Sequence, residues 1–257
     1  MNLQHLFCRH CQVISANERS WHNAVMNDEF NKLLKGFRFP PEIIQYAIWL
    51  YFTFPLSFRD VELLLAQRGI QVSHESIRSW CYRFGPVLAG QLRRKRRRPS
   101  DKWHLDEVFI TINRHRYYLW RAVDSQGMVL DILVQNRRNA QAAKRFFQAV
   151  LETTPSKPRV IVTDGLRSYN IISRDLLPDV DHRRSKYLNN RAENSHQPTR
   201  RRERRLQRFQ SPEHAQRFLS IFGIIYHYFH PKKHQIPANT YRNDLAGRFE
   251  TWTYLAA

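Results

Sequence analysis

The chain has 257 residues and a formal net charge of +20 at pH 7, from 42 Lys and Arg against 22 Asp and Glu. Such a basic balance predicts a polyanionic partner, either nucleic acid or an acidic membrane surface. An aromatic content of 13% excludes a disordered basic tail and indicates a folded protein. The longest apolar stretch, residues 43–54, is too short for a membrane span of about 20 residues, so we expect a core helix there and no membrane partner.

Residues 1–33 are polar and lack clear periodicity, and we expect an N-terminal extension there. Cys8 and Cys11 form a lone CxxC pair in it, with His5 and His22 nearby. A structural zinc site needs four ligands, commonly in two spaced pairs, and the second pair is missing, so we do not expect zinc. Three cysteines in the whole chain give no disulfide framework, which suits a reducing compartment.

Residues 34–92 predict three helices. Pro41 opens the first, Ser57 begins a capping box for the second, Gly69 ends it, and Ser73 caps the third. Two short helices joined by a tight turn with glycine fit a helix-turn-helix DNA-binding domain, although an ordinary helical hairpin gives the same pattern. The exposed residues of the third helix that we expect to reach base edges in the major groove are His74, Glu75, Arg78 and Ser79.

Residues 93–100 form the most visible linker, with six basic residues followed by Pro-Ser. Charge runs usually lie on solvated surface. Between two DNA-handling domains we expect this run to track the phosphate backbone, which adds affinity without sequence information. Its residues are Arg93, Arg94, Lys95, Arg96, Arg97 and Arg98. A second basic run, which includes Arg201 and Arg202, is expected to do the same farther along the chain.

Residues 101–230 predict a mixed α/β domain. Residues 103–113 are β-branched and aromatic, which is typical of a strand, and Asp106 stands in the apolar middle of this strand. A carboxylate there is costly unless it is paired or bound to a metal. Two further strand-like runs follow, joined by a turn at residues 124–127, so we expect an antiparallel meander of three strands.

Asn139 caps an amphipathic helix, and a short apolar strand follows at residues 159–163. A strand reached through a helix is expected to run parallel to a neighbour and to be buried on both faces. Asp164 follows directly, at the carboxyl end of this strand, where open sheets place their ligands.

Glu193 lies in a helix predicted to begin near residue 189, and Arg200 follows about two helical turns later. The two side chains could therefore share one helix face. Pro198 leaves this alignment open, because an interior proline removes a hydrogen bond and kinks a helix.

Three carboxylates, Asp106, Asp164 and Glu193, suit a magnesium or manganese site. Magnesium prefers oxygen ligands and is usually held by a few carboxylates with phosphate and water. Two such ions, about 3.5–4 Å apart, stabilise the attacking and leaving oxygens of an in-line phosphoryl displacement. Nearby arginines hold phosphates through paired hydrogen bonds.

The segments WHLDEVFI, YLWRAVD, VTDG and SKYLNNRAENSH resemble the DDE transposases of bacterial insertion sequences, most closely the insertion-sequence-six family, which moves by replicative cointegrate formation. The resemblance covers about residues 34–230, and KYLNN followed by Glu193 is its most specific part. It implies a ribonuclease-H-like catalytic fold, a mixed sheet flanked by helices. The catalytic residues it implies are Asp106, Asp164, Glu193 and the basic Arg200. The stretch between Asp164 and Glu193 is shorter than in better known members.

The resemblance implies metal-dependent DNA cleavage and strand transfer on double-stranded DNA, at terminal inverted repeats and at a target. It also implies a homodimer or higher oligomer on DNA, in the bacterial cytoplasm at the nucleoid. One alternative is a DNA-binding regulator that uses the helix-turn-helix without chemistry. Another is a tyrosine recombinase, with His214 and Arg217 as an HxxR pattern and Tyr241 or Tyr254 as nucleophile, although HxxR occurs by chance and the strand-rich centre does not suit that class.

A final helix is predicted to start at Ser211-Pro212, with a broad apolar stripe packed against the sheet. Residues 231–257 form a C-terminal tail that contains Trp252. The sequence leaves open whether this tail docks on the core or on a second subunit.

Overall fold

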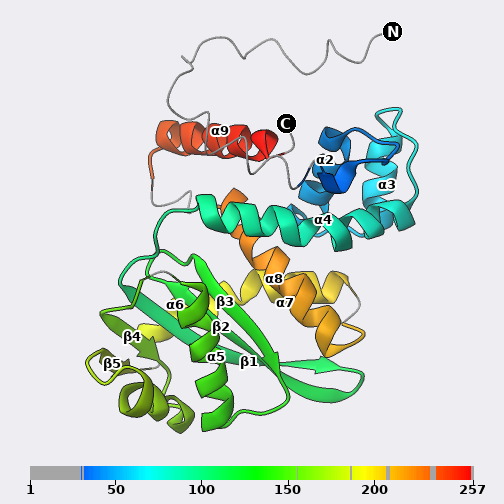
Figure 1. The fold of residues 1–257 in the computed structure, drawn as a ribbon. Helices are drawn as coiled ribbons and strands as arrows, with labels where there is room; N and C mark the ends of the chain where they lie inside the picture. Colours follow the sequence, from blue (N-terminus) through cyan, green and yellow to red (C-terminus); the bar gives the residue numbers. More distant parts are fainter. Residues whose placement is uncertain are drawn as a thin grey trace.

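The computed structural model has a helical part and a sheet part (Figure 1). The residues that it describes are 30, 32–154, 156–185, 187–206, 209–231 and 236–255, without the side chains of 172, 173, 187, 191 and 193. Helices α2, α3, α4 and α9 gather on one side, the five-stranded sheet lies on the other, and α8 runs between α4 and the sheet. The predicted Cys8–Cys11 pair lies outside the described residues.

The helical part contains the three predicted helices, α2 (Pro41–Thr53), α3 (Phe58–Ala66) and α4 (His74–Lys95). The predicted caps are confirmed: Ser57 and Asp60 form a reciprocal capping box, and the Ser73 hydroxyl accepts from a backbone N–H of α4. Gly69 takes a φ of +76° at the turn between α3 and α4, a left-handed conformation that favours glycine.

The boundaries of this part differ from those predicted at both ends. Phe30 is fully buried and packs edge-on against Phe84, so the packed helical part begins before residue 34. At the other end, α4 includes residues 93–95, which the sequence assigns to a linker. Charge alone could not locate this end of the helix, because arginine and lysine are good helix formers as well as common linker residues.

The sheet has the order β3-β2-β1-β4-β5. Its strands are β1 (Lys102–Ile112), β2 (His115–Asp124), β3 (Val129–Gln135), β4 (Val160–Thr163) and β5 (Asp181–Arg184). The antiparallel meander β1-β2-β3 is confirmed, as is the parallel pairing of β4 with β1. This order and these directions confirm the ribonuclease-H-like fold class. The sequence did not predict β5, because this edge strand reads Asp-His-Arg-Arg and has no apolar alternation.

Helices pack on both faces of the sheet. Helix α5 (Ala140–Thr153) begins at the predicted Asn139 cap and covers one face with buried phenylalanines, next to Trp103 and Trp120. Helix α8 (Pro212–Phe229) lies on the other face, against β3. A Cβ at Gly223 of α8 would lie 2.9 Å from Cδ1 of Ile132 on β3, so any larger residue there would require the end of the Ile132 side chain to shift. The predicted packing of this helix on the sheet is confirmed.

The C-terminal tail forms helix α9 (Ala238–Tyr254), which docks on the helical part of the same chain. The Gln45 side chain donates a hydrogen bond of 2.6 Å to the carbonyl of Trp252. The Trp252 ring meets Phe229 of α8 edge-on, with centroids 5.5 Å apart. The sequence left open whether the tail docks on the core or on a second subunit, and in this structure it docks on the core of its own chain. None of the helices in the described ranges is long and apolar enough to cross a membrane.

Candidate active site

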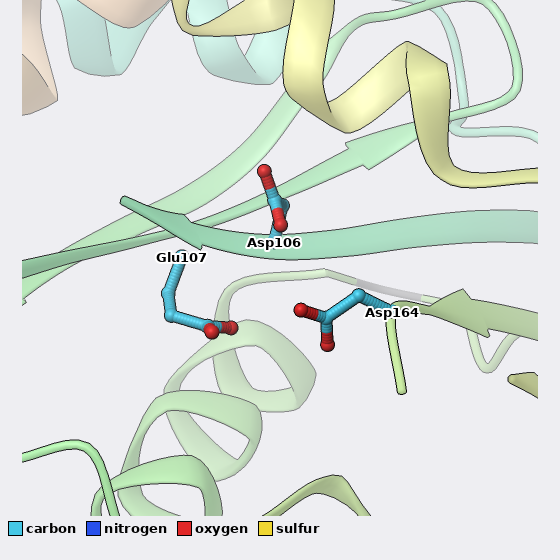
Figure 2. Close-up of side chains that lie close together, drawn as sticks. All are labelled: Asp106, Glu107 and Asp164. Carbon is cyan, nitrogen blue, oxygen red and sulfur yellow. The ribbon is translucent and has the colours of Figure 1, made fainter. Parts of the chain in front are cut away.

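Asp106 and Asp164 meet at an opening in the sheet. Strand β4 pairs with β1 only from Lys102 to His104, so in the described part of the chain β1 continues past this pairing without a strand neighbour on that side. Asp164 follows the last residue of β4 and therefore lies beside the part of β1 that carries Asp106. Carboxylate oxygens of Asp106, Glu107 and Asp164 all lie within 4.8 Å of one another (Figure 2).

The two aspartates are shielded but accessible. The side chain of Asp106 is 14% exposed, and that of Asp164 is 28% exposed. The Nε2 atom of the buried His196 lies 3.4 Å from Asp106 Oδ2. Asp164 accepts a hydrogen bond from the backbone N–H of Leu166 through Oδ1, which fixes the carboxylate at the strand end. Both groups therefore have a defined position and remain open to a ligand from solvent.

Glu107 is the acid that the sequence analysis missed. Residues alternate across a strand, so Asp106 and Glu107 leave β1 on opposite sides, and the alternation predicts that only one of them serves the site. At Glu107, β1 is no longer paired with β4. The Glu107 carboxylate therefore turns toward Asp164 (Figure 2). Two consecutive acids, Asp and Glu, inside one apolar strand were the signal in the sequence that could have indicated a second acid at the site.

Both oxygens of Glu107 already have donors. Arg138 Nε donates to Oε1 at 2.7 Å, and the Tyr169 hydroxyl donates to Oε2 at 2.6 Å. Burial, with a smaller contribution from the negative charge of Asp164, raises the pKa of Glu107 to about 7, against the lowering effect of these two donors. Because both of its oxygens already accept hydrogen bonds, Glu107 holds Arg138 and Tyr169 in place.

The donor set fits a hard divalent cation. Three carboxylates stand close together, and Arg138 is the cation beside them, with Nη2 at 3.9 Å from Asp164 Oδ2. Close carboxylates repel one another, and a cation between them relieves that repulsion. Oxygen-only ligands suit Mg²⁺ or Mn²⁺ rather than zinc. Asp106, Glu107 and Asp164 are the described residues that can offer oxygens to such an ion, and of these Asp106 and Asp164 are the more exposed to solvent.

Helix α6 (Asn190–Ser195), which carries Glu193, is fixed beside Asp106. On β1, the carbonyl of Leu105 accepts a hydrogen bond of 2.8 Å from the Asn189 side chain. On β2, Arg121 is opposite Asp106 in the strand register and donates to the carbonyl of Ser195. Burial lowers the pKa of Arg121 to about 10, so this side chain stays charged at neutral pH. The side chain of Glu193 itself lies outside the described part of the chain.

The sequence left open whether one helix carries both Glu193 and Arg200, and the structure has two helices there. Helix α6 ends at Ser195, and a second helix, α7 (Gln197–Arg205), begins after His196. Pro198 stands in the first turn of α7, where its missing N–H has no intrahelical partner to lose. Arg200 is exposed on α7, so its predicted place on one face with Glu193 does not follow from helical periodicity.

The structure corrects the predicted contact of Arg202 with DNA. Its side chain is buried, 2% exposed, and donates to the backbone carbonyls of Tyr51 at 2.8 Å and Leu56 at 2.5 Å. The guanidinium also lies 4.4 Å from the centroid of the Tyr51 ring. Because the side chain is buried, a phosphate in solvent cannot reach its N–H groups. The charge run could not predict this, because it does not reveal which face of α7 packs against α2.

The other predicted DNA contacts divide into exposed and engaged residues. Glu75, Arg78 and Ser79 are exposed on α4, and Arg94, Arg97, Arg98 and Arg201 are exposed as well. Lys95 is half-buried, with its ammonium 4.7 Å from the Tyr254 ring centroid. His74 is half-buried, 3.2 Å from Glu62.

Two arginines of the basic run serve the fold. Arg93 donates to the carbonyl of Leu130 at 3.2 Å, and Arg96 donates to that of Val129 at 2.7 Å. Both bonds hold the end of α4 against β3. Arg93 and Arg96 therefore support the fold, and their expected contact with DNA stays a prediction.

The sheet order and the acidic opening together define a ribonuclease-H-like protein with a cluster of carboxylates beside the central strand β1. The family model described as a DDE domain, of the IS240 transposase type, matches residues 100–232, more than half of the chain. The chain therefore belongs to the DDE family of insertion-sequence transposases, which are polynucleotidyl transferases. This family match confirms the resemblance found in the sequence and excludes the tyrosine-recombinase alternative.

Two curated relatives come from Staphylococcus aureus. They are the transposase for insertion sequence-like element IS431mec, from strain Mu50, and the transposase for insertion sequence element IS257 in transposon Tn4003. Each is 28% identical over 195 residues, which cover 74% of this chain and 86% of the relative. Among solved structures, the HTLV-2 integrase catalytic core domain in complex with magnesium aligns at 13% identity with a TM-score of 0.37, over 51% of this chain and 86% of that chain.

Proposed function

We propose that this transposase binds the ends of its insertion sequence and, with Mg²⁺ or Mn²⁺, cleaves the DNA and joins its 3′ end to a target. The observation that carries the proposal is the gathering of Asp106 and Asp164, with oxygens inside a 4.8 Å cluster, at an accessible opening beside the central strand β1. Residues so far apart in the chain meet there because β4 returns parallel to β1 and ends two residues short of Asp106.

Asp106, Asp164 and Glu193 are the residues that would hold the ions. When bound, the ions activate the attacking oxygen and neutralise the leaving 3′-oxygen. The two aspartates supply charged oxygens at fixed positions, and the hydrogen bonds of Arg121 and Asn189 hold the helix of Glu193 close to them. Arg200, exposed on the next helix, would bind a phosphate of the scissile strand through paired hydrogen bonds.

Helices α3 and α4 would supply the end binding. Their capped ends and the tight turn at Gly69 fit a helix-turn-helix, with α4 as the reading helix in the major groove. Arg94, Arg97 and Arg98 would add phosphate contacts. Joining two ends to one target requires more than one copy of the protein, so we propose a dimer or larger assembly on DNA, working in the cytoplasm at the nucleoid.

Incubation of the full chain with end-bearing duplex, in Mg²⁺ or in chelator, tests this function. We expect a product joined at its 3′ end in Mg²⁺ and none in chelator, with DNA binding in both. Binding in both conditions without any joined product would contradict the proposal and favour a DNA-binding regulator.

A comparison of Glu193→Gln with Glu107→Gln tests which glutamate completes the site. We expect Glu193→Gln to lower strand transfer by at least about 10³-fold, because a lost metal ligand removes several kcal/mol of transition-state stabilisation. Glu107→Gln should lower it by roughly 10–100-fold, the usual effect of disturbing a residue that supports the ligands. The measurement is the strand-transfer rate of each variant, with binding of the end-bearing duplex as control. A larger loss in Glu107→Gln than in Glu193→Gln would make Glu107 the third metal-binding acid.

A further inference from the structure

A surface groove joins the predicted reading helix to the catalytic domain. We call it the α4–α8 groove; its volume is about 440 Å³, and its lining residues are Glu75, Arg78, Ser79, Tyr82, Arg83 and Arg217. The first five stand on α4, and Arg217 stands on α8, which packs against α4. The sequence analysis included the first three in a DNA-binding set and did not include the other three.

The α4 side of the groove is one continuous helix face. Its residues recur at intervals of three and four, so they line up along the helix, opposite the face buried by Ile77, Trp80 and Phe84. Because α4 runs for 22 residues, this face extends beyond the residues predicted to read bases and reaches the surface of α8.

Arg217 is held at the groove and exposed to solvent. Its guanidinium lies 5.5 Å from the centroid of the Tyr82 ring, a cation–π contact between α8 and α4. Tyr82 also lies near His214, one turn before Arg217 on α8, with ring centroids 6.3 Å apart. The position of Arg217 relative to α4 is therefore defined by packing.

The groove carries net positive charge. Arg78, Arg83 and Arg217 line it against one carboxylate, Glu75, which lies 3.5 Å from the Arg78 guanidinium. Arg83 is exposed, with its guanidinium 5.1 Å from the Phe37 ring centroid. Exposed guanidinium groups of this density suit the phosphate backbone of duplex DNA, which guanidinium binds through paired hydrogen bonds.

We propose that the α4–α8 groove seats the backbone of the insertion-sequence end, with Arg217 as a phosphate contact contributed by the catalytic domain. The proposal rests on the proposed function and deepens it. DNA read by α4 would then also touch α8, and α8 packs against β3 through the close approach of Gly223 to Ile132. The bound end would thus have a fixed position relative to the sheet that carries Asp106.

Binding of end-bearing and scrambled duplexes, measured in chelator over a range of salt concentrations, tests the proposal. For Arg217→Ala we expect weaker binding of both duplexes by a similar factor, about tenfold, and a salt slope smaller by about one. Arg78→Ala, which removes a base-reading candidate, should weaken the end-bearing duplex more than the scrambled one. Arg217→Lys keeps the charge and should retain most of the slope.

Arg242→Ala is the matched control, since Arg242 is an exposed arginine on α9, outside the groove. If Arg217→Ala and Arg242→Ala give the same slope as the wild type, the groove does not hold DNA. Loss of self-association in Arg217→Ala with an unchanged slope would assign the groove to a second copy and overturn the proposal. A wild-type chain that fails to bind DNA would overturn the proposed function itself, so the two failures are distinguishable.

Discussion

Asp106→Asn and Asp164→Asn should each abolish strand transfer, with a loss of at least about 10³-fold, while end binding stays within about twofold of the wild type. The amide keeps the shape of the carboxylate but removes its charge and much of its affinity for a hard cation. The predicted DNA-reading residues lie on α4, in the helical part of the molecule, so their contacts should not change (Figure 1). Joined product and bound fraction, measured on the same end-bearing duplex, give both quantities.

The melting temperatures of the two variants distinguish a loss of chemistry from misfolding. Removing one of several close carboxylates relieves repulsion, so both variants should melt at or above the temperature of the wild type when no metal is added. Asp181→Asn, at an exposed acid of the edge strand β5, is the control and should retain strand transfer. Normal strand transfer by Asp106→Asn, or parallel loss of binding and chemistry in both variants, would contradict the assignment.

Arg202→Ala should have the largest effect on stability, about 3–5 kcal/mol, although Arg202 belongs to a run of arginines whose charge suits DNA. The substitution leaves the carbonyls of Tyr51 and Leu56 without their donor and removes the cation–π contact with Tyr51. For a chain of this size the melting temperature should fall by roughly 10 °C. Chemical denaturation and thermal melting measure this loss.

Arg201→Ala is the matched comparison one residue earlier, at an exposed position. Its stability should change by less than about 0.5 kcal/mol, while its DNA binding should weaken and lose salt dependence. Equal stabilities of the two variants would show that Arg202 is not needed to join α7 to the helical part. Together the two variants separate the structural arginine from a DNA-binding one.

Much of the fold follows from local sequence patterns. The caps at Ser57, Ser73 and Asn139 satisfy helix N–H groups within a few residues of the chain, so the sequence predicts where these helices begin. Apolar strands and the turn at residues 124–127 predict the meander for the same reason, since Asp124 accepts from the backbone of Gln126 and Met128.

Features that depend on tertiary neighbours could not be predicted in this way. Strand β5 is polar, and its pairing is supplied by the edge of β4. Arg202 and Arg96 have the composition of a solvated charge run, but backbone carbonyls of distant elements bind them. The α4–α8 groove needs Arg217 beside Tyr82, two residues that the chain separates by more than a hundred positions.

The candidate site was predicted in part. Asp106 and Asp164 were each predicted from a strand context, and the structure brings them together at the opening beside β1. Glu107 was missed because strand alternation sends it to the opposite face, and only the early end of β4 allows it to join the opening. The role of Glu193 remains a prediction from the family motif and from the position of α6.

Cleavage of the polypeptide by hydroxyl radicals, generated at Fe²⁺ bound in place of Mg²⁺, tests most directly whether Asp106, Asp164 and Glu193 form one metal site. We expect cuts near residues 105–107, 163–165 and 190–195, all lost when Mg²⁺ competes and all weakened in Asp106→Asn. Cuts near Asp106 and Asp164 but none in α6 would contradict the place of Glu193. Cuts at unrelated positions, unaffected by Asp106→Asn, would contradict the metal site as a whole.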